Sequence, residues 1–400
     1  MLALSLLTSL LAATASAELS SQLTQVQDFG PNPRNVSFYI YVPKVLQAKP
    51  PILVAPHWCH GTAQQVFDYR SWASAGDQYG FISIYPNTSN ADQCWDVSSK
   101  ESLTHNGGGD AQGIVSMVKW ALEKYKGDRD RVFVTGTSSG AMMTNVLVGS
   151  YPDVFAGGSA WAGVAFGCFA GDGYDVWNDA CATGKTIKTG QEWATLVKQA
   201  YPGYRGFRPK LQVLHGTNDT VLYPQNLQEE IKQWTSVFGY AESRVESTPD
   251  TPLKGWTRYR YGPKFEAYAA AGVDHNIPNQ DNLVIEYFDL VRDPSSPACD
   301  WTGQWLTSDA RAEMQRDSAE GVLLAAAEIE MEQAGADAWV RVGGCGRAPA
   351  RVLHSTSTVG RLPTHCIVST SRGCRDGPVS PARPATSLHV LASHAIPNFS

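Results

Sequence analysis

The sequence predicts an α/β fold, with a mostly parallel central sheet covered by helices on both faces. Short apolar runs typical of buried strands, such as 52–55 and 210–215, alternate with amphipathic helical segments such as 114–125. This alternation implies crossovers between parallel strands. One strand, at 132–134, runs through a glycine-rich turn into a helix. The 400 residues, 43% hydrophobic and 18% charged, are ample for a sizeable core.

The net charge and the absence of long apolar runs limit the partners. A formal charge of −6 argues against a nucleic-acid surface and against polybasic attachment to a membrane. No stretch beyond the N-terminus is long and apolar enough for a membrane helix. We therefore expect a monomer that binds a neutral substrate, with no nucleic acid and no membrane as partners.

The first residues predict a secretory signal. An apolar run from Leu2 to about Ala13 is followed by small residues, Ala15-Ser16-Ala17, spaced like a cleavage site. We expect cleavage after residue 17 and a secreted, extracellular protein. In that location the sequons at Asn35 and Asn87 become expected glycosylation sites.

The cysteines suit an oxidising compartment. There are eight, and no C-x-x-C pair suggests a zinc site. Cys168 and Cys181 form the most local pair and would close a loop after the helix that begins near residue 141. Connectivity does not follow from spacing, and Cys59 could be either bridged or free and buried.

The first half of the chain holds the following expected elements. Residues 35–43 alternate as an outer strand would, 52–55 form a buried strand, and 81–86 return as another. Helical spacing spans 67–79. Asp110 is placed to cap an amphipathic helix over 114–125, and 159–163 reads as a weaker strand.

In the second half, 164–189 has no regular period and 193–201 is a short helix. The remaining expected elements are a strand at 210–215, a helix at 225–238, strands at 256–261 and 265–270, and a helix at 281–290. We expect a single folded α/β domain to span 18–290. The tail, 291–400, contains an Ala- and Glu-rich helical stretch at 309–334, after which the sequence shows no hydrophobic periodicity. We therefore expect the tail to be largely disordered, or to be translated from an out-of-frame or unspliced transcript.

The glycine-rich turn suggests a nucleophile. Ser138 lies at its tip, between Gly136 and Gly140 in the pattern G-x-S-x-G, with a strand before it and a helix after it. A nucleophile on such a sharp corner needs neighbours without side chains, so that the backbone can pass closely. Ser138 is the candidate nucleophile.

The acid and the base that would activate Ser138 follow in later loops. Asp219 comes after the strand at 210–215, and His275 comes after the strand at 265–270. The order Ser, Asp, His after three strands is that of the α/β-hydrolases. Asp274 is adjacent to His275 and less able to face it. Asp153 and Asp172 are alternative acids in weaker contexts.

These residue types support acyl transfer. His275 would take the proton of Ser138, and Asp219 would fix the tautomer of the imidazole. Backbone N–H groups of Ser139 and of Cys59, in the loop HWCHGT, are the expected oxyanion donors. The chemistry calls for no metal and no cofactor.

Other polar residues have simpler interpretations. We expect packing or loop-ordering roles for the remaining histidines near strand ends, His57, His60 and His215, and for His105. Gly107-Gly108-Gly109 lacks the lysine of a phosphate-binding loop and reads as a flexible turn. The sequon at Asn218 would carry a glycan against the catalytic loop, so we expect it to be unmodified.

Five stretches together resemble the fungal secreted acetylxylan esterases of carbohydrate esterase family 1, relatives of feruloyl esterases and polyhydroxybutyrate depolymerases. They are PHWCHGTAQQ, CWD, LTHNGGGDAQGIVSMVKWAL, VFVTGTSSGAMMTNVL and HGTNDTVLYPQN. The resemblance covers about 28–290. It implies an α/β-hydrolase that removes acetyl groups from xylan or another hemicellulose.

The resemblance carries the triad onto Ser138, Asp219 and His275 and the oxyanion amides onto Cys59 and Ser139. It also implies that Trp177 contacts the sugar, where the residues alone favour a core tryptophan. The chain departs from the family pattern in Asp274, where glycine is common, and in His60, where threonine is expected.

Two other functions stay open. A feruloyl esterase would keep the mechanism but need a longer aromatic slot for the acyl group. A non-catalytic carbohydrate-binding protein could use the same fold, although the complete triad weighs against it.

Overall fold

The computed structural model describes residues 22–243, 245–291, 298–299 and 305–306. All of them lie within one compact unit of the chain. The predicted signal at 1–17 and nearly all of the predicted tail, including its helix at 309–334, lie outside the described residues. Two short strands, β11 (Ala298–Cys299) and β12 (Trp305–Leu306), pair with each other.

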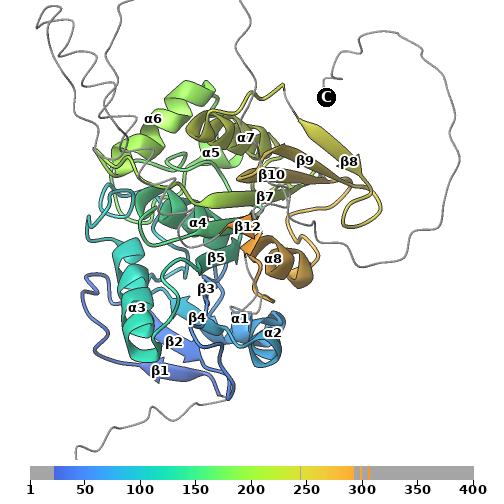
Figure 1. Ribbon diagram of the computed structural model, residues 1–400. Coiled ribbons are helices and arrows are strands. Elements are labelled where there is room, and N and C mark those ends of the chain that lie inside the picture. Colours follow the sequence, from blue (N-terminus) through green and yellow to red (C-terminus); the bar gives the residue numbers. More distant parts are fainter. Residues whose placement is uncertain (1–21, 244, 292–297, 300–304, 307–400) are drawn as a thin grey trace, which may run out of the picture. The chain divides into compact units, whose positions relative to one another are not determined.

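Ten strands of the described residues form one sheet, in the order β1-β2-β4-β3-β5-β6-β7-β10-β9-β8 (Figure 1). The six central strands, from β4 to β10, are parallel, and the strands outside them pair antiparallel. The predicted mostly parallel sheet is therefore confirmed. The strands are β1 (Thr24–Val26), β2 (Ser37–Tyr41), β3 (Ile52–Val54), β4 (Ile82–Asn87), β5 (Val132–Thr137), β6 (Gly157–Trp161), β7 (Lys210–Gly216), β8 (Glu246–Pro249), β9 (Trp256–Gly262) and β10 (Phe265–Ala270).

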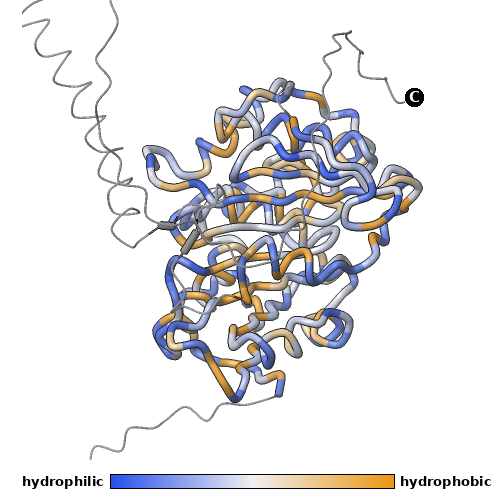
Figure 2. The backbone as a smooth tube through the Cα atoms, turned by 45° about the vertical axis from the view of Figure 1, so that its right-hand side comes forward, coloured by the Kyte–Doolittle hydropathy of each residue, from blue (hydrophilic) through white to orange (hydrophobic). Residues whose placement is uncertain are grey.

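Alternating side chains of the central strands enter two separate cores. Ile52 and Val54 of β3 join one apolar cluster, and Leu53 between them joins the other. All three are fully buried, as expected of a parallel strand covered on both faces. In Figure 2 the hydrophobic stretches run through the interior strands.

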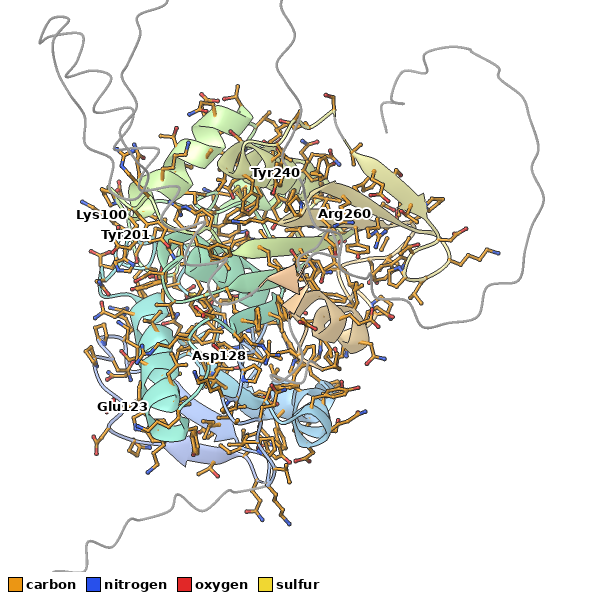
Figure 3. All side chains as sticks on the ribbon, viewed as in Figure 1. Lys100, Glu123, Asp128, Tyr201, Tyr240 and Arg260 are labelled. Carbon is orange, nitrogen blue, oxygen red and sulfur yellow. A yellow bond between two sulfur atoms is a disulfide. The ribbon has the colours of Figure 1, made fainter. Side chains whose placement is uncertain are left out.

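Helices complete the two outer layers. The first cluster is covered by α3 (Asp110–Tyr125), α4 (Ser139–Ser150), α6 (Gly190–Ala200) and α7 (Gln225–Phe238), and the second by α1 (Ala63–Tyr69), α2 (Trp72–Tyr79) and α8 (Asp281–Phe288). A short helix, α5 (Asp179–Ala182), lies in the connection after β6. Side chains fill the space between sheet and helices (Figure 3), and the largest fully buried ones include Trp72, Trp161, Trp193 and Trp234.

Most predicted elements appear within a few residues of their expected bounds, but two expectations were wrong and two strands were missed. The segment 67–79 is two helices, since α1 ends at Tyr69 and α2 starts at Trp72. Asp110 is the first residue of α3, and its side chain does not cap that helix. The strands β1 and β8 were not predicted because they are short and largely exposed, with no apolar alternation.

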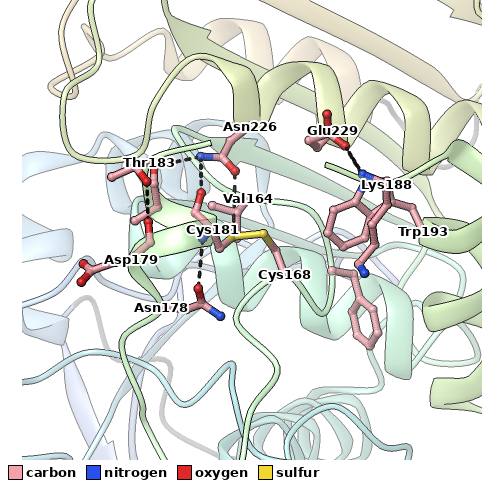
Figure 4. Close-up of a disulfide and its surroundings, with 12 residues drawn as sticks. Val164, Cys168, Asn178, Asp179, Cys181, Thr183, Lys188, Trp193, Asn226 and Glu229 are labelled. Atoms are coloured by element: carbon pink, nitrogen blue, oxygen red, sulfur yellow. Dashed lines mark hydrogen bonds between the residues drawn. A yellow bond between two sulfur atoms is a disulfide. The ribbon is translucent and has the colours of Figure 1, made fainter. Parts of the chain in front are cut away.

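Two disulfides join loops within the described residues. The bond between Cys168 and Cys181 confirms the expected local pair, and Cys59 is bridged to Cys94 rather than free. Figure 4 shows the Cys168–Cys181 bond beside α7, where the Asn226 amide donates to the carbonyl oxygen of Cys181 at 3.1 Å. The bond thus ties the irregular segment after β6 to a helix of the outer layer.

A buried ion pair joins α8 to the α1–α2 corner. The guanidinium of Arg70 lies 2.6 Å from a carboxylate oxygen of Asp281, and both side chains are nearly inaccessible. The other oxygen of Asp281 accepts hydrogen bonds from the backbone N–H and the hydroxyl of Ser71, both at 2.7 Å. Asp281 therefore fixes the start of the last helix.

We predict that Asp281→Ala lowers the free energy of unfolding by about 3 kcal/mol, because it leaves the Arg70 charge buried without a partner. Urea unfolding of the full chain measures this loss. The control is Glu286→Ala, which removes an exposed carboxylate from the same helix and should change stability by less than about 0.5 kcal/mol. Equal stability of the two variants would contradict the role of the ion pair.

Candidate active site

The corner between β5 and α4 holds Ser138 in a backbone conformation that side chains rarely adopt. Its φ is 57° and its ψ is −122°. The Ser138 N–H donates to the Trp161 carbonyl oxygen at 2.9 Å, and the Ser138 carbonyl oxygen accepts from the N–H groups of Ala141 and Met142. These bonds hold the strained residue with its side chain at the carboxyl end of the strand.

The flanking glycines are required by close backbone contacts. A Cβ atom on Gly140 would lie 2.3 Å from the carbonyl oxygen of Pro56, which follows β3. A Cβ on Gly136 would lie 2.4 Å from the backbone of Gly140. Strand, corner and helix can approach this closely only because both positions lack side chains.

The structure brings Ser138, His275 and Asp219 into one hydrogen-bonded chain. Nε2 of His275 lies 2.9 Å from Oγ of Ser138, and Nδ1 of His275 lies 2.7 Å from Oδ2 of Asp219. The Asp219 side chain is buried, while that of His275 is 17% exposed. This arrangement allows the imidazole to accept the serine proton while its Nδ1–H donates to the carboxylate.

Asp219 is held and charged by its surroundings. Its Oδ1 accepts hydrogen bonds from the backbone N–H groups of Val221 and Leu222, both at 2.9 Å. Burial alone would raise the pKa of Asp219, but its hydrogen bonds to His215 and His275 outweigh burial and hold the pKa well below its usual range. The carboxylate is therefore ionised wherever the imidazole must be stabilised.

The other candidate acids lie elsewhere. Asp274 is exposed, and its carboxylate accepts the N–H of Asn276 at 2.8 Å. Asp153 lies 3.7 Å from His105, and Asp172 is exposed on the loop after β6. Of the four candidate acids, Asp219 is the one that is hydrogen-bonded to His275.

The expected oxyanion donors lie on two elements that are linked to each other. Ser139 is the first residue of α4, so its N–H has no acceptor within the helix. Trp95 donates its backbone N–H to the hydroxyl of Ser139 and its indole N–H to the carbonyl oxygen of His57, both at 2.8 Å. The adjacent Cys94 is bonded to Cys59. One dipeptide therefore joins the Cys59 loop to the start of the nucleophile helix.

Neither expected oxyanion donor is hydrogen-bonded to another group of the described residues. In the described part of the chain, the backbone N–H groups of Cys59 and Ser139 make no hydrogen bond. Both remain available to an oxygen of a bound substrate.

The remaining histidines order loops, as expected, with one addition. His57 is buried; its Nδ1–H donates to the Trp58 carbonyl oxygen at 2.7 Å and its Nε2 accepts from the Thr88 N–H at 3.2 Å. Burial lowers the pKa of His57 to about 4, so it is neutral. His60 is exposed, and His105 stacks on Tyr201 at 3.7 Å.

His215 contacts the site itself. Its Nε2 lies 3.3 Å from Oδ2 of Asp219, so it is a partner of the triad acid and more than a packing residue. The spacing of four residues across the end of β7 is the signal that could have revealed it.

Trp177 lies on the loop after β6 and is 50% exposed, so it is not a core residue. Its ring meets Phe169 edge-on at 5.2 Å, and its indole N–H donates to Asp179 at 2.9 Å. The loop is also hydrogen-bonded to the buried Asp96, whose carboxylate accepts the N–H of Asp175 at 3.0 Å.

Two buried carboxylates organise these loops and were not predicted as site residues. Asp96 also accepts bonds from Ser98 and Ser99. Asp110 accepts from the Tyr174 hydroxyl and from the Asp96 N–H. Burial raises the pKa of Asp110 to about 6 despite these hydrogen bonds. Each carboxylate also binds a loop that is distant in sequence, since Asp96 accepts from Asp175 and Asp110 accepts from Tyr174.

The expected glycosylation sites differ in access. Asn35 is exposed, whereas the Asn87 side chain is half-buried and accepts the Ala63 N–H at 2.9 Å while donating to the Thr88 carbonyl oxygen at 3.0 Å. Modification of Asn87 would have to break these bonds, so the prediction suits Asn35 better. Asn218 is exposed beside Asp219.

The described residues give no group of three or more side chains placed to hold a metal ion. Within the same residues, every helix is too short or too polar to cross a bilayer.

Comparison with known proteins places the chain in a family. The family model described as esterase PHB depolymerase matches residues 36–247. Acetylxylan esterase A of Emericella nidulans is 49% identical over 270 residues, which are 67% of this chain and 89% of that protein. A probable acetylxylan esterase A of Aspergillus niger is 46% identical over 292 residues, 72% of this chain and 96% of that protein.

A solved structure agrees with these relatives. The acetyl xylan esterase from Aspergillus awamori superposes with a TM-score of 0.67 at 44% identity, covering 67% of this chain and 99% of that one. The resemblance drawn from the sequence motifs is confirmed, as is the α/β-hydrolase fold. The chain belongs to the esterase PHB depolymerase family, and it is a carboxylic ester hydrolase.

Proposed function

We propose that the protein removes O-acetyl groups from xylan, or from a related acetylated hemicellulose, through an acyl-enzyme formed on Ser138. The observation that carries the mechanism is the hydrogen-bonded chain from Ser138 through His275 to the buried Asp219. The substrate class rests on the relatives, which are named acetylxylan esterases at 46–49% identity.

Acylation follows from the geometry. Ser138 Oγ attacks the acetyl carbonyl carbon while His275 Nε2 takes the hydroxyl proton, and the ionised Asp219 stabilises the imidazolium that forms. The N–H groups of Cys59 and Ser139 are the donors for the oxyanion, with the positive end of α4 behind Ser139. When the tetrahedral intermediate collapses, His275 gives its proton to the departing sugar hydroxyl.

Deacylation follows the same steps, with water in place of the serine as the nucleophile. His275 takes a proton from the water as its oxygen attacks the acetyl-serine. The second intermediate expels Ser138 Oγ, which recovers its proton from the imidazolium, and acetate is released. The serine and the imidazole return to their starting protonation states, so the cycle needs no other reactant.

Trp177 is the proposed sugar-contacting residue. Its half-exposed ring stands on a loop that is hydrogen-bonded through Asp96 and tied to α5 by the Cys168–Cys181 bond. An aromatic ring on a rigid base offers a flat apolar face to a sugar at little cost in conformational entropy. We place the enzyme outside the cell, since two disulfides in the described residues suit an oxidising compartment.

We predict that the full chain releases acetate from acetylated xylan and that Ser138→Ala lowers the rate at least about 10⁴-fold, because the variant lacks the nucleophile. Acetate is measured beside ferulate from a feruloylated arabinoxylan. Acetate loss in a folded variant supports the proposal. Ferulate as the main product would leave the mechanism intact and assign the feruloyl esterase function, and unchanged acetate release by the variant would overturn the nucleophile.

A second prediction separates Asp219 from its neighbour. Asp219→Asn should lower kcat by roughly 10⁴-fold with little change in KM, because the amide cannot stabilise the imidazolium. Asp274→Asn, the matched change on the exposed carboxylate beside His275, should keep kcat within about twofold. Steady-state kinetics on a small acetyl ester measure both. The reverse pattern would make Asp274 the acid of the triad.

A further inference from the structure

A carboxyl group lies buried behind the triad without a full set of partners. Glu230 of α7 is fully buried, and its Oε1 accepts a hydrogen bond from the Asn145 amide of α4 at 2.7 Å. Its Oε2 is inaccessible and has no partner among the described residues. An unpaired buried carboxyl oxygen is costly, so its surroundings call for an explanation.

The titratable group that acts on Glu230 is His215 of β7. Its Nε2 lies 2.7 Å from the Leu222 carbonyl oxygen, which can only accept, so Nε2 carries a hydrogen. The same Nε2 lies 3.3 Å from Oδ2 of Asp219. Its Nδ1 is buried and, within the described residues, has no partner.

We propose that Glu230 and His215 extend the triad into the core, with one internal water joining Glu230 Oε2 to His215 Nδ1, so that Glu230 is a positioning residue for Asp219. This inference rests on the proposed serine mechanism. Helix α7 packs on β7, and each element carries one buried polar atom that has no protein partner within the described residues. Such pairs of buried polar atoms are the setting in which proteins hold internal water. The chain would then run from Ser138 through His275, Asp219 and His215 to Glu230.

The groups that face Glu230 define its electrostatics. Helix α4 contributes the neutral Asn145, and the connection after β6 contributes Gly163, where a Cβ atom would lie 3.5 Å from Oε1. Strand β7 contributes His215, whose field acts on the carboxyl group. Burial is the largest effect and raises the pKa of Glu230 to about 7, while His215 and Asn145 oppose it.

The charge of Glu230 should therefore change across the working pH range. Below its pKa the carboxyl group is neutral, and above it the buried negative charge favours positive charge nearby. The imidazolium of His275, formed in the transition state, is such a charge and is connected to Glu230 through Asp219 and His215. Ionisation of Glu230 should therefore increase kcat.

The test is Glu230→Gln in the full chain, since glutamine keeps the size of the side chain and an acceptor for Asn145 but cannot ionise. We measure kcat on a small acetyl ester from about pH 5.5 to about pH 8.5 and take the ratio of wild type to variant. We expect a ratio near one at the acid end and a several-fold rise by the alkaline end, because a buried charge acts on the imidazolium with little screening by solvent.

The matched control is Glu229→Gln, on the neighbouring residue of α7. Glu229 is equally buried, but its carboxylate is paired with Lys232 at 2.7 Å and accepts the Trp193 indole N–H at 2.7 Å (Figure 4). Hydrogen bonds outweigh burial and lower the pKa of Glu229, so it keeps its charge over this range. We expect the control to lose stability, because its paired carboxylate is removed, but its ratio of kcat values should not change with pH.

Each outcome decides a separate question. A ratio for Glu230→Gln that is constant with pH, at any value, means a structural role only and overturns the inference. Absence of ester cleavage by the wild type overturns the proposed function instead. If the variant does not fold, the wild-type profile of kcat decides, since the inference requires more than one ionisation between about pH 5.5 and about pH 8.5 and a single ionisation contradicts it.

Discussion

The backbone contact between Gly140 and Pro56 is the constraint on which the active site depends. It brings the start of α4 against the end of β3, so the nucleophile corner and the loop that carries Cys59 meet. Ser138 adopts a strained backbone conformation there because both its N–H and its carbonyl oxygen are hydrogen-bonded to neighbouring elements. The Cys59–Cys94 bond and the two hydrogen bonds of Trp95 then hold the same two elements from the opposite side.

Buried carboxylates are the second organising feature, and each has a different task. Asp219 is charged and orients His275, while Asp96 and Asp110 gather backbone N–H and hydroxyl donors from loops that carry no regular structure. Asp281 forms an ion pair with Arg70 and so holds the start of α8, the helix that follows the His275 loop. Because these groups are bound by several donors at once, the loops at the carboxyl ends of the strands can be irregular in sequence and still be rigid.

The sequence predicted what depends on local patterns. The central strands, the corner at Ser138 and the local pair Cys168–Cys181 are all encoded in short stretches, and so is the order of the loops that bring Asp219 and His275 together. It did not predict the pairing of Cys59 with Cys94, the partnership of His215 with Asp219, or the tasks of Asp96 and Asp110. Those depend on side chains that meet only when distant loops come together, and periodicity carries no information about such meetings. The break between α1 and α2 was missed because both helices bury apolar residues on one continuous face.

The hydrogen bond between His275 and Ser138 joins residues 137 positions apart, and the bond between His275 and Asp219 spans 56. Contacts of this range form late, because a chain must close large loops before they contribute any energy. The three groups meet only after the parallel strands β5, β7 and β10 have docked in order, so collapse and helix formation alone would leave the serine without its base. During refolding from denaturant, recovered hydrolysis should therefore lag behind the recovery of far-ultraviolet circular dichroism, and the active site serves as a kinetic reporter of completed topology.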